Sequence, residues 1–333
     1  MTDRGRHVFG IDVGGTNLRV ALGSPTGELL DKRHRDTQAE PGAEAGLKAL
    51  GEMMAELAAA HHLQMSDFGA AGVGVPGPTD PVTGVLFNPP HLPGWHNVPV
   101  ARRLEEATGI PIWIENDAQL AAYGEFHHGA GRGSRHMVYV TVSTGIGGGI
   151  IIDGKLYTGA GGTAGEVGHV VIDPDGPVCS CGRRGHLEAL ASGTSMARIA
   201  AERIAAGETS SLSQLPKITA QAIGVAAEAG DPLAQSVLEN AGRLLGLSFG
   251  GLLNILDPEV LVLGGGVIQI GPRLLDHVYQ AIKDAAFEST YSHVRIATVE
   301  LGQDAGLIGA LEFARDHLPG GREGDAAPEV PAG

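Results

Sequence analysis

The chain has 333 residues, of which 43% are hydrophobic and 18% charged, enough for a large core and most simply two domains. Its formal net charge is −15 and no block of Lys and Arg offsets it, which argues against nucleic-acid binding. The sequence has no run of 18 apolar residues and no apolar leader of signal-peptide length at its start, so we expect a cytoplasmic protein without a membrane partner.

The chain opens with a predicted strand at residues 8–11, a glycine-containing turn and a second strand at 18–22. No helix follows the turn, so it is not a dinucleotide-binding loop. Two glycines in a tight hairpin can direct their amides toward a phosphate. A plain hairpin would not require Asp12, which could hold water around Mg²⁺, or Thr16, which could donate to a phosphate oxygen.

The next stretch of the chain predicts strands at 28–34, 70–75 and 110–114 and helices at 42–62 and 98–108. The polar residues 115–117 directly follow the last of these strands. Residues 118–127 then predict a helix. Two interpretations of the motif stay open: Asn116 or Asp117 caps this helix, or Asp117 lies in the crevice where open α/β sheets bind ligands.

A second glycine motif, Thr144 to Gly149, follows a predicted strand at 136–143 and precedes strands at 150–152 and 155–157. Residues 138–152 therefore repeat the order of residues 8–22, a weak duplication with a period of roughly 130 residues. The repeat suggests two similar lobes, each of which offers one glycine hairpin to a shared ligand.

Both cysteines of the chain, Cys179 and Cys181, lie in one short stretch between His169 and His186. Two cysteines so close together cannot form a disulfide framework, which favours a reducing compartment. Four such ligands on a glycine-punctuated loop predict a tetrahedral zinc site. The alternative is a surface loop with two idle thiols.

The remainder of the chain is mostly helical. Helices are expected at 192–206, 219–229, 232–256, 272–287 and 304–317, and strands at 260–263 and 295–299. A triple glycine at 264–266 could let a flat adenine or ribose approach, or could be a plain turn. The Gly/Pro/Ala/Glu tail at 319–333 is expected to be disordered.

Six motifs in this order make the chain resemble the ROK family of sugar kinases and repressors, most closely its glucokinase branch. They are DVGGT, GVPG, END, TGIGGG, E-x-G-H and C-x-C-G-x-x-G-x-x-E, at 12–16, 74–77, 115–117, 144–149, 166–169 and 179–188. The resemblance implies an α/β fold of the two-lobed, actin-like ATPase (ribonuclease H-like) type, each lobe a mixed sheet with helices. It implies a small lobe at 1–118, on which a C-terminal helix at 303–318 packs back, and a large lobe at 119–302 with the zinc loop and ATP-binding elements.

The resemblance also implies ATP-dependent phosphorylation of the 6-hydroxyl of glucose, with Asp117 as the general base and Mg²⁺ bound with ATP. The implied sugar contacts are Asn88, Asn116, Asp117, Glu166, His169 and Glu188. The implied ATP contacts are Asp12, Gly14, Gly15, Thr16, Thr144, Gly145 and Gly265. In such enzymes a histidine at the place of His169 can bind zinc through one ring nitrogen and the sugar through the other, and family members are commonly homodimers or homotetramers.

One residue departs from the family pattern, which has a third cysteine where this chain has His186. Because imidazole is a good zinc ligand, we expect one structural zinc ion per chain, held by His169, Cys179, Cys181 and His186. If His186 pointed away, the site would keep three protein ligands.

Other functions remain as alternatives. Another hexose or an N-acetylhexosamine could replace glucose, and polyphosphate could replace ATP. A repressor of the family would carry a winged-helix domain before the first glycine motif, whereas the first expected strand here begins near His7. A non-catalytic actin-like scaffold would require neither Asp117 nor the zinc loop.

Overall fold

The computed structural model describes residues 5–39, 41–89 and 92–319, and these divide into two compact units. The first unit comprises the described residues of Met1–Gly133, Leu156–Ala164 and Glu300–Gly333, and the second comprises Ser134–Lys155 and Gly165–Val299. Most of the expected disordered tail therefore lies outside the described residues. Among those described, no helix combines the length and apolar character needed to cross a bilayer.

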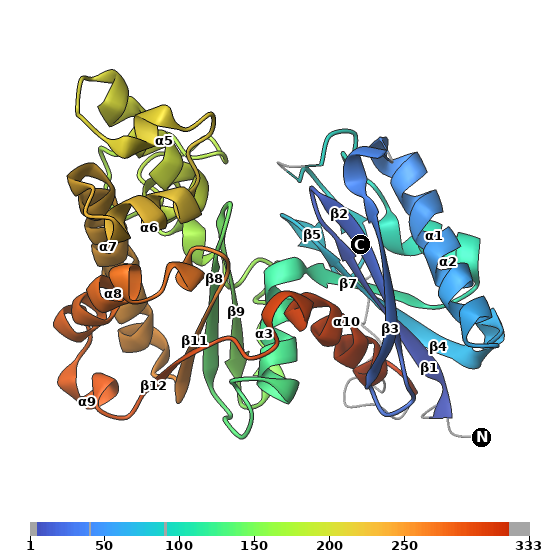
Figure 1. The fold of residues 1–333 in the computed structure, drawn as a ribbon. Helices are drawn as coiled ribbons and strands as arrows, with labels where there is room; N and C mark the ends of the chain where they lie inside the picture. The colour runs from blue at the N-terminus through green and yellow to red at the C-terminus, as the bar shows by residue number, and fades with distance from the viewer. Residues whose placement is uncertain (1–4, 40, 90–91, 320–333) are drawn as a thin grey trace. The chain divides into compact units, whose positions relative to one another are not determined.

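The first unit is built on a five-stranded mixed sheet (Figure 1). Its strands are β1 (His7–Val13), β2 (Asn17–Gly23), β3 (Leu29–Asp36), β4 (Phe68–Val75) and β7 (Ile112–Asn116), in the order β3-β2-β1-β4-β7. The first three strands pair antiparallel, and β1, β4 and β7 pair parallel. A small ribbon of β5 (Thr79–Asp80) and β6 (Val85–Leu86) lies beyond β4 in the chain.

Helices cover both faces of this sheet (Figure 1). They are α1 (Gly42–Ala60) and α2 (Val100–Thr108) on one face, and α3 (Asp117–His128) and α10 (Ala305–Asp316) on the other. Alternating residues of β1 serve the two faces, since Phe9 and Ile11 join the core under α1 while Val8 packs with α10. Gly10 lies against the backbone of α10, where a side chain would collide with Leu307.

The second unit repeats this sheet order. Its strands are β8 (Met137–Val142), β9 (Ile146–Ile152), β10 (Lys155–Leu156), β11 (Val260–Gly264) and β12 (Arg295–Thr298), in the order β10-β9-β8-β11-β12. As in the first unit, the first two strands, β8 and β9, pair antiparallel, and β11 pairs parallel with both β8 and β12. The duplication expected from residues 8–22 and 138–152 is thus present as two sheets of the same topology.

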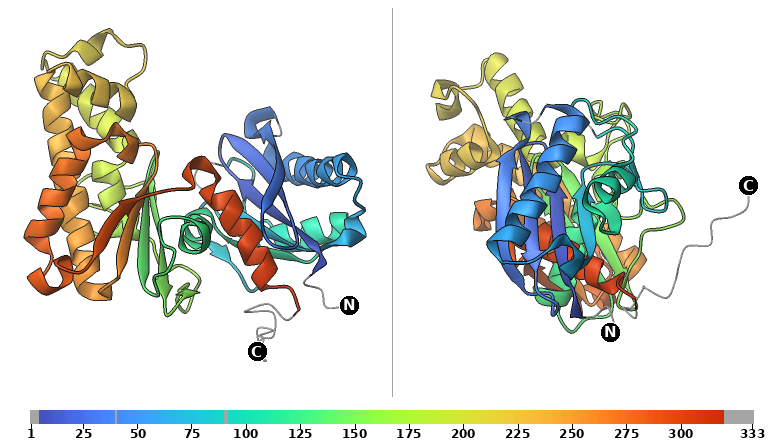
Figure 2. Two further views of the ribbon diagram at one scale, coloured as in Figure 1. Left: turned by 60° about the horizontal axis from the view of Figure 1, so that its bottom comes forward. Right: turned by 90° about the vertical axis from the view of Figure 1, so that its right-hand side faces the viewer.

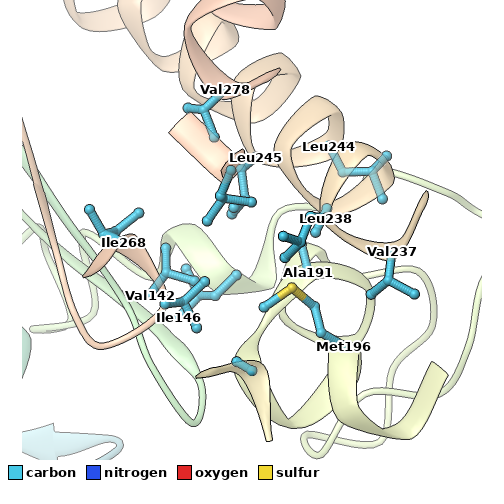
Figure 3. Close-up of a cluster of buried hydrophobic side chains, with 14 of the residues drawn as sticks. Val142, Ile146, Ala191, Met196, Val237, Leu238, Leu244, Leu245, Ile268 and Val278 are labelled. Carbon is cyan, nitrogen blue, oxygen red and sulfur yellow. The ribbon is translucent and has the colours of Figure 1, made fainter. Parts of the chain in front are cut away.

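Helices of the second unit gather on one side of its strands (Figure 2). They are α4 (Leu187–Ala191), α5 (Gly193–Ala205), α6 (Ala220–Glu228), α7 (Pro232–Leu256), α8 (Pro272–Ala285) and α9 (Glu288–Tyr291). Figure 3 shows the core that they share with the sheet, where Val142 and Ile146 lie near Ala191, Met196 and the leucines of α7. This core joins the start of β9, which directly follows the expected ATP contacts Thr144 and Gly145, to α4, which carries the expected sugar contact Glu188.

Six short 3-10 turns with assigned ends complete the described elements: η2 (Thr37–Ala39), η3 (Met65–Asp67), η4 (Val167–His169), η5 (Ser211–Gln214), η6 (Ile268–Ile270) and η7 (Gly302–Asp304). The expected helices and strands are present with ends shifted by a few residues. The ribbon β5–β6 and the short helix α4 were not expected.

Two expectations differ from the structure. Residues 147–149 were expected in a turn but belong to β9, where Gly148 pairs with Val140. Glycine is needed in this strand because a Cβ on Gly148 would lie 2.9 Å from the carbonyl oxygen of Gly165. The first lobe was expected to end at residue 118, whereas the first unit includes all of α3, because Gly124 lets α3 pack closely on Gly309 of α10.

Candidate functional site

Asp117 lies in the first turn of α3, directly after β7. Asn116 is the N-cap of this helix, because its Oδ1 accepts hydrogen bonds from Ala118 N at 2.9 Å and Gln119 N at 3.2 Å. Asp117 Oδ1 also accepts from Ala118 N at 2.7 Å, and the residue is half-buried. Of the two interpretations of the motif, capping therefore belongs to Asn116, and a carboxylate at a helix N-terminus is electrostatically favoured there.

The first glycine loop is a tight turn between β1 and β2. Gly14 N donates to Asn17 O at 2.9 Å, and Thr37 Oγ1 donates to Gly14 O at 2.7 Å. Gly15 and Thr16 are exposed. The amide of Gly14 thus serves the turn itself, and the carbonyl oxygen of Thr16 accepts a hydrogen bond from Thr37 N at 2.9 Å, whereas the amides of Gly15 and Thr16 could meet a phosphate.

Asp12 is buried and paired with Arg19, its partner across the hairpin. Arg19 Nε donates to Asp12 Oδ2 at 2.8 Å, and Arg19 Nη2 also contacts this oxygen. Burial raises the pKa of Asp12, and the charge and hydrogen bonds of Arg19 oppose that shift. The sequence analysis missed Arg19, although the hairpin register places it opposite Asp12.

The second glycine loop, at the turn from β8 to β9, is held by Glu188. Glu188 Oε2 accepts a hydrogen bond from Ile146 N at 3.0 Å, and its Oε1 accepts from Ser180 Oγ at 3.0 Å. Gly145 lies against this carboxylate, where a Cβ would collide with Oε2. Thr144 is exposed, and its carbonyl oxygen accepts a hydrogen bond from Thr194 N at 3.4 Å.

The third glycine motif lies beside the second. Gly265 has a φ of +91°, and a Cβ there would collide with the carbonyl of Val142 at the end of β8. The same carbonyl accepts from Val267 N at 3.0 Å. The Thr144–Gly145 loop and Gly265 therefore follow neighbouring ends of β8 and β11, the edge at which open α/β sheets bind ligands.

Glu166 directly precedes the short turn η4, and His169 is the last residue of that turn. His169 Nε2 lies 3.8 Å from Glu166 Oε2. Burial raises the pKa of Glu166, His169 opposes the shift and Glu188 adds to it. Within the second unit the structure thus brings Glu166, His169 and Glu188 into one neighbourhood of interacting charges.

The four expected metal ligands converge. The ligand atoms of His169, Cys179, Cys181 and His186 all lie within 4.8 Å of one another. His186 Nδ1 is 3.2 Å from both His169 Nδ1 and Cys181 Sγ, and Cys179 Sγ is 3.7 Å from His169 Nδ1. Zinc binds nitrogen and sulfur at about 2.0–2.3 Å, so tetrahedral ligands lie roughly 3.3–3.8 Å apart. The donor set and spacing fit zinc.

His186 points into this cluster. It is 4% exposed and occupies the residue before α4. Burial lowers the pKa of His186, and the charge of His169 adds to the effect, which favours the neutral imidazole that metals bind. Ser180, between the two cysteines, was not expected at the site, and only its position between two expected ligands could have indicated it.

Asn88 stands apart from these contacts in a loop after β6. It is exposed, and its Oδ1 lies 2.8 Å from His96 Nδ1. The sequence analysis did not identify His96. The first unit thus contains Asn88, Asn116, Asp117 and the first glycine loop with Asp12, Gly14, Gly15 and Thr16, and the second contains the remaining expected site residues.

The described residues contain a second group of three potential ligands, His127, Glu312 and Asp316. Arg315 Nη1 donates to Glu312 Oε2 at 2.6 Å, and His128 Nε2 lies 3.2 Å from the same atom. Burial alone would raise the pKa of Glu312. The hydrogen bond from His128 and the charge of Arg315 outweigh burial and lower this pKa to about 2. A guanidinium already neutralises this carboxylate, so the group is an ion-pair network between α3 and α10.

Residues 8–317 of the chain match the sequence model of the ROK family. The glucokinase of Halalkalibacterium halodurans is 36% identical over 309 residues, covering 91% of this chain and 93% of that protein. The N-acetylmannosamine kinase of Escherichia fergusonii is 36% identical over 306 residues, covering 92% and 97%.

Among solved structures, a ROK family glucokinase from Streptomyces griseus in complex with glucose and AMPPNP is 32% identical. The TM-score is 0.78, and the match covers 93% of this chain and 99% of that one. These matches extend over both units described above. The chain therefore belongs to the ROK family and has its actin-like ATPase fold.

Proposed function

We propose that this protein is an ATP-dependent glucokinase, which transfers the γ-phosphoryl group of ATP to the 6-hydroxyl of glucose with Asp117 as general base. Family membership and the glucokinase relative support a sugar kinase. The observation that carries the role of Asp117 is the cap provided by Asn116. Asn116 caps the start of α3, and the carboxylate of Asp117 follows it in the first turn, where it could act as the base that accepts a proton from a hydroxyl nucleophile.

The sugar contacts in this proposal are carboxylate, amide and imidazole groups, which can each bond hydroxyl groups. They are Asn88, Asn116, Asp117, Glu166, His169 and Glu188. Two of them are oriented before any ligand binds, since Asn116 is fixed as a cap and Glu188 by Ile146 and Ser180. A site whose polar groups are already oriented discriminates strongly against sugars that leave those groups unpaired.

The phosphate-binding role falls to backbone loops. Phosphoryl transfer depends on positioning and on neutralising charge more than on covalent chemistry. We assign the phosphates to Gly14, Gly15, Thr16, Thr144 and Gly145 and the adenosine to the region of Gly265. Asp12 would help to place Mg²⁺ through water, and Arg19 would keep its carboxylate in one orientation.

We also propose that one structural zinc ion is held by His169, Cys179, Cys181 and His186. The ion would fix the orientation of a loop that carries a sugar ligand. His169 directs Nδ1 toward the cluster and Nε2 toward Glu166, so one ring could serve the metal and the sugar at once. The assembly in this proposal is a homodimer or homotetramer.

An N-acetylmannosamine kinase is the second candidate, because a relative with that name is as similar in identity as the glucokinase. The test is ADP release with Mg²⁺ and ATP across glucose, mannose, fructose, glucosamine, N-acetylglucosamine and N-acetylmannosamine. A strong glucose signal supports the proposal. Activity with N-acetylmannosamine and none with glucose would transfer the assignment to the second candidate, and polyphosphate in place of ATP tests the donor.

A further inference from the structure

Gln119, on α3 two residues after Asp117, is buried and anchors a distant segment. Its side chain is 3% exposed. Nε2 donates to Ala164 O at 3.1 Å and lies 3.4 Å from Gly162 O. Among the described residues Oε1 has no hydrogen-bond partner. The amide therefore serves as a donor, and turning it over would place its oxygen against two carbonyl oxygens.

The anchored segment, Leu156–Ala164, belongs to the first unit although the chain on both sides of it belongs to the second. Ala164 N donates to Thr158 O at 2.9 Å, which closes the segment into a compact loop. Gly162, with a φ of +74°, lies so close to Pro81 that a Cβ would be 2.9 Å from its Cδ. The Gly162–Pro81 contact connects the segment to the loop after β5. The two hydrogen bonds of Gln119 connect it to α3.

The residue after this segment is Gly165, and the next is Glu166. Gly165 has a φ of +89° and packs against the backbone of Gly148 in β9. The backbone that leads to Glu166 is thus fixed at Gly165 by β9 and at Ala164 by Gln119. Because only one residue separates Ala164 from Glu166, loss of the hydrogen bond to Ala164 would remove one of the two restraints on the backbone that carries the carboxylate.

We propose that Gln119 is a positioning residue for the sugar: it holds the backbone before Glu166 and ties that backbone to the helix that begins with Asp117. The inference rests on the proposed function. Gln119 itself need not touch the sugar. Its removal should therefore weaken sugar binding through Glu166 while leaving the ATP-binding loops of the chain unchanged.

Two variants test this role. Gln119→Met keeps the length of the side chain without a donor, and Gln119→Glu keeps its shape but presents carboxylate oxygens to two carbonyl oxygens. Gln280→Met is the matched control, because Gln280 is exposed on α8 and bonds only within its own helix turn among the described contacts.

The first measurement needs no substrate. Peptide-resolved hydrogen exchange of the full-length protein should show faster exchange at residues 156–166 in both Gln119 variants and not in Gln280→Met. Exchange in β1 and β2 should match the wild type. Unchanged exchange at 156–166 would overturn the anchoring role.

The second measurement separates positioning from general damage. The KM for the active sugar should rise about tenfold, the scale of one or two lost hydrogen bonds, while the KM for ATP and kcat stay within about twofold. An unchanged sugar KM, or an equal loss for sugar and ATP together with a lower Tm, would overturn the proposal. Wild-type protein inactive on every sugar would instead refute the proposed function, and the exchange experiment would still decide whether Gln119 anchors the segment.

Discussion

Glu188 accepts a hydrogen bond from the amide of Ile146 at 3.0 Å. Its other carboxylate oxygen accepts from Ser180 Oγ, between the two cysteines. One side chain thus connects the glycine loop before β9 with the loop that carries the candidate metal ligands Cys179 and Cys181. The hydrophobic core supports the same connection, since Ile146 and Leu187 belong to one buried cluster. A substitution that displaces one of these loops should therefore also displace the other through Glu188.

Gly145→Ala tests this connection. The new Cβ would collide with Glu188 Oε2 and push the carboxylate away from Ile146. We expect weaker binding of both sugar and ATP, each by about tenfold or more, because one hydrogen bond is lost and a loop is displaced. Gly161→Ala is the control, since a Cβ there meets nothing within 4 Å. Normal KM values for both substrates in Gly145→Ala would contradict the connection.

Asp117→Asn tests the general base. General-base help is typically worth about 10²- to 10⁴-fold, so kcat should fall by that order. Asparagine keeps the shape of the side chain, and the Asn116 cap is untouched, so sugar affinity and Tm should change little. Steady-state kinetics and calorimetric titration with the sugar provide the two readouts. A variant with wild-type turnover would remove Asp117 from the mechanism.

The zinc assignment predicts about one metal ion per chain by elemental analysis of protein purified without chelators. Cys179→Ser or His186→Ala should lose metal and lower Tm, because binding free energy at a structural site contributes to folding. His186→Cys restores the third thiolate of the family pattern and should retain zinc. Absence of zinc from the wild type would refute the assignment, whatever the activity of the protein.

Glu312 should give the stability of the first unit a marked acid dependence. Its pKa is about 2 in the folded state against an ordinary 4.5. A carboxyl with a lowered folded pKa stabilises above its unfolded pKa, and this contribution is lost as pH falls from about 4.5 through about 2. The shift corresponds to about 3 kcal/mol at neutral pH.

Glu312→Gln should therefore have a lower Tm at pH 7 and a flatter decline between pH 5 and pH 3 than the wild type, by calorimetry. Glu228→Gln removes an exposed ion pair with Arg273 and should have almost no effect. Parallel Tm profiles for wild type and Glu312→Gln would show that the network with His128 and Arg315 does not stabilise the fold.

Much of the fold could be predicted from the sequence because its periodicity and glycine turns are local signals. The two strand–turn–strand repeats were visible in residues 8–22 and 138–152, and both sheets have the same strand order. The extent of β9 was not predictable from local pattern. Gly147 to Gly149 look like a turn in sequence, and only the packing of the chain near Gly165 explains why glycine is required within a strand.

The candidate metal ligands, His186 among them, were predicted from residue types, whereas the direction of the His186 imidazole has no local signal in the sequence. The path of the loop before α4 turns the imidazole of His186 toward Cys181 Sγ. Long-range partners were also missed. Arg19 on Asp12 depends on strand register, and Gln119 on Ala164 joins residues 45 positions apart. The register of the β1–β2 hairpin could have indicated Arg19, whereas no local pattern indicates the contact of Gln119 with Ala164.

The central claim is phosphorylation of glucose at its 6-hydroxyl with ATP as donor. The most direct measurement is formation of glucose 6-phosphate, followed by a coupled dehydrogenase assay, from purified protein with glucose, ATP and Mg²⁺. The account predicts rapid product formation by the wild type and a loss of about 10²-fold or more in Asp117→Asn. Absence of glucose 6-phosphate from a wild-type protein that phosphorylates another sugar, or equal rates in the two proteins, would contradict it.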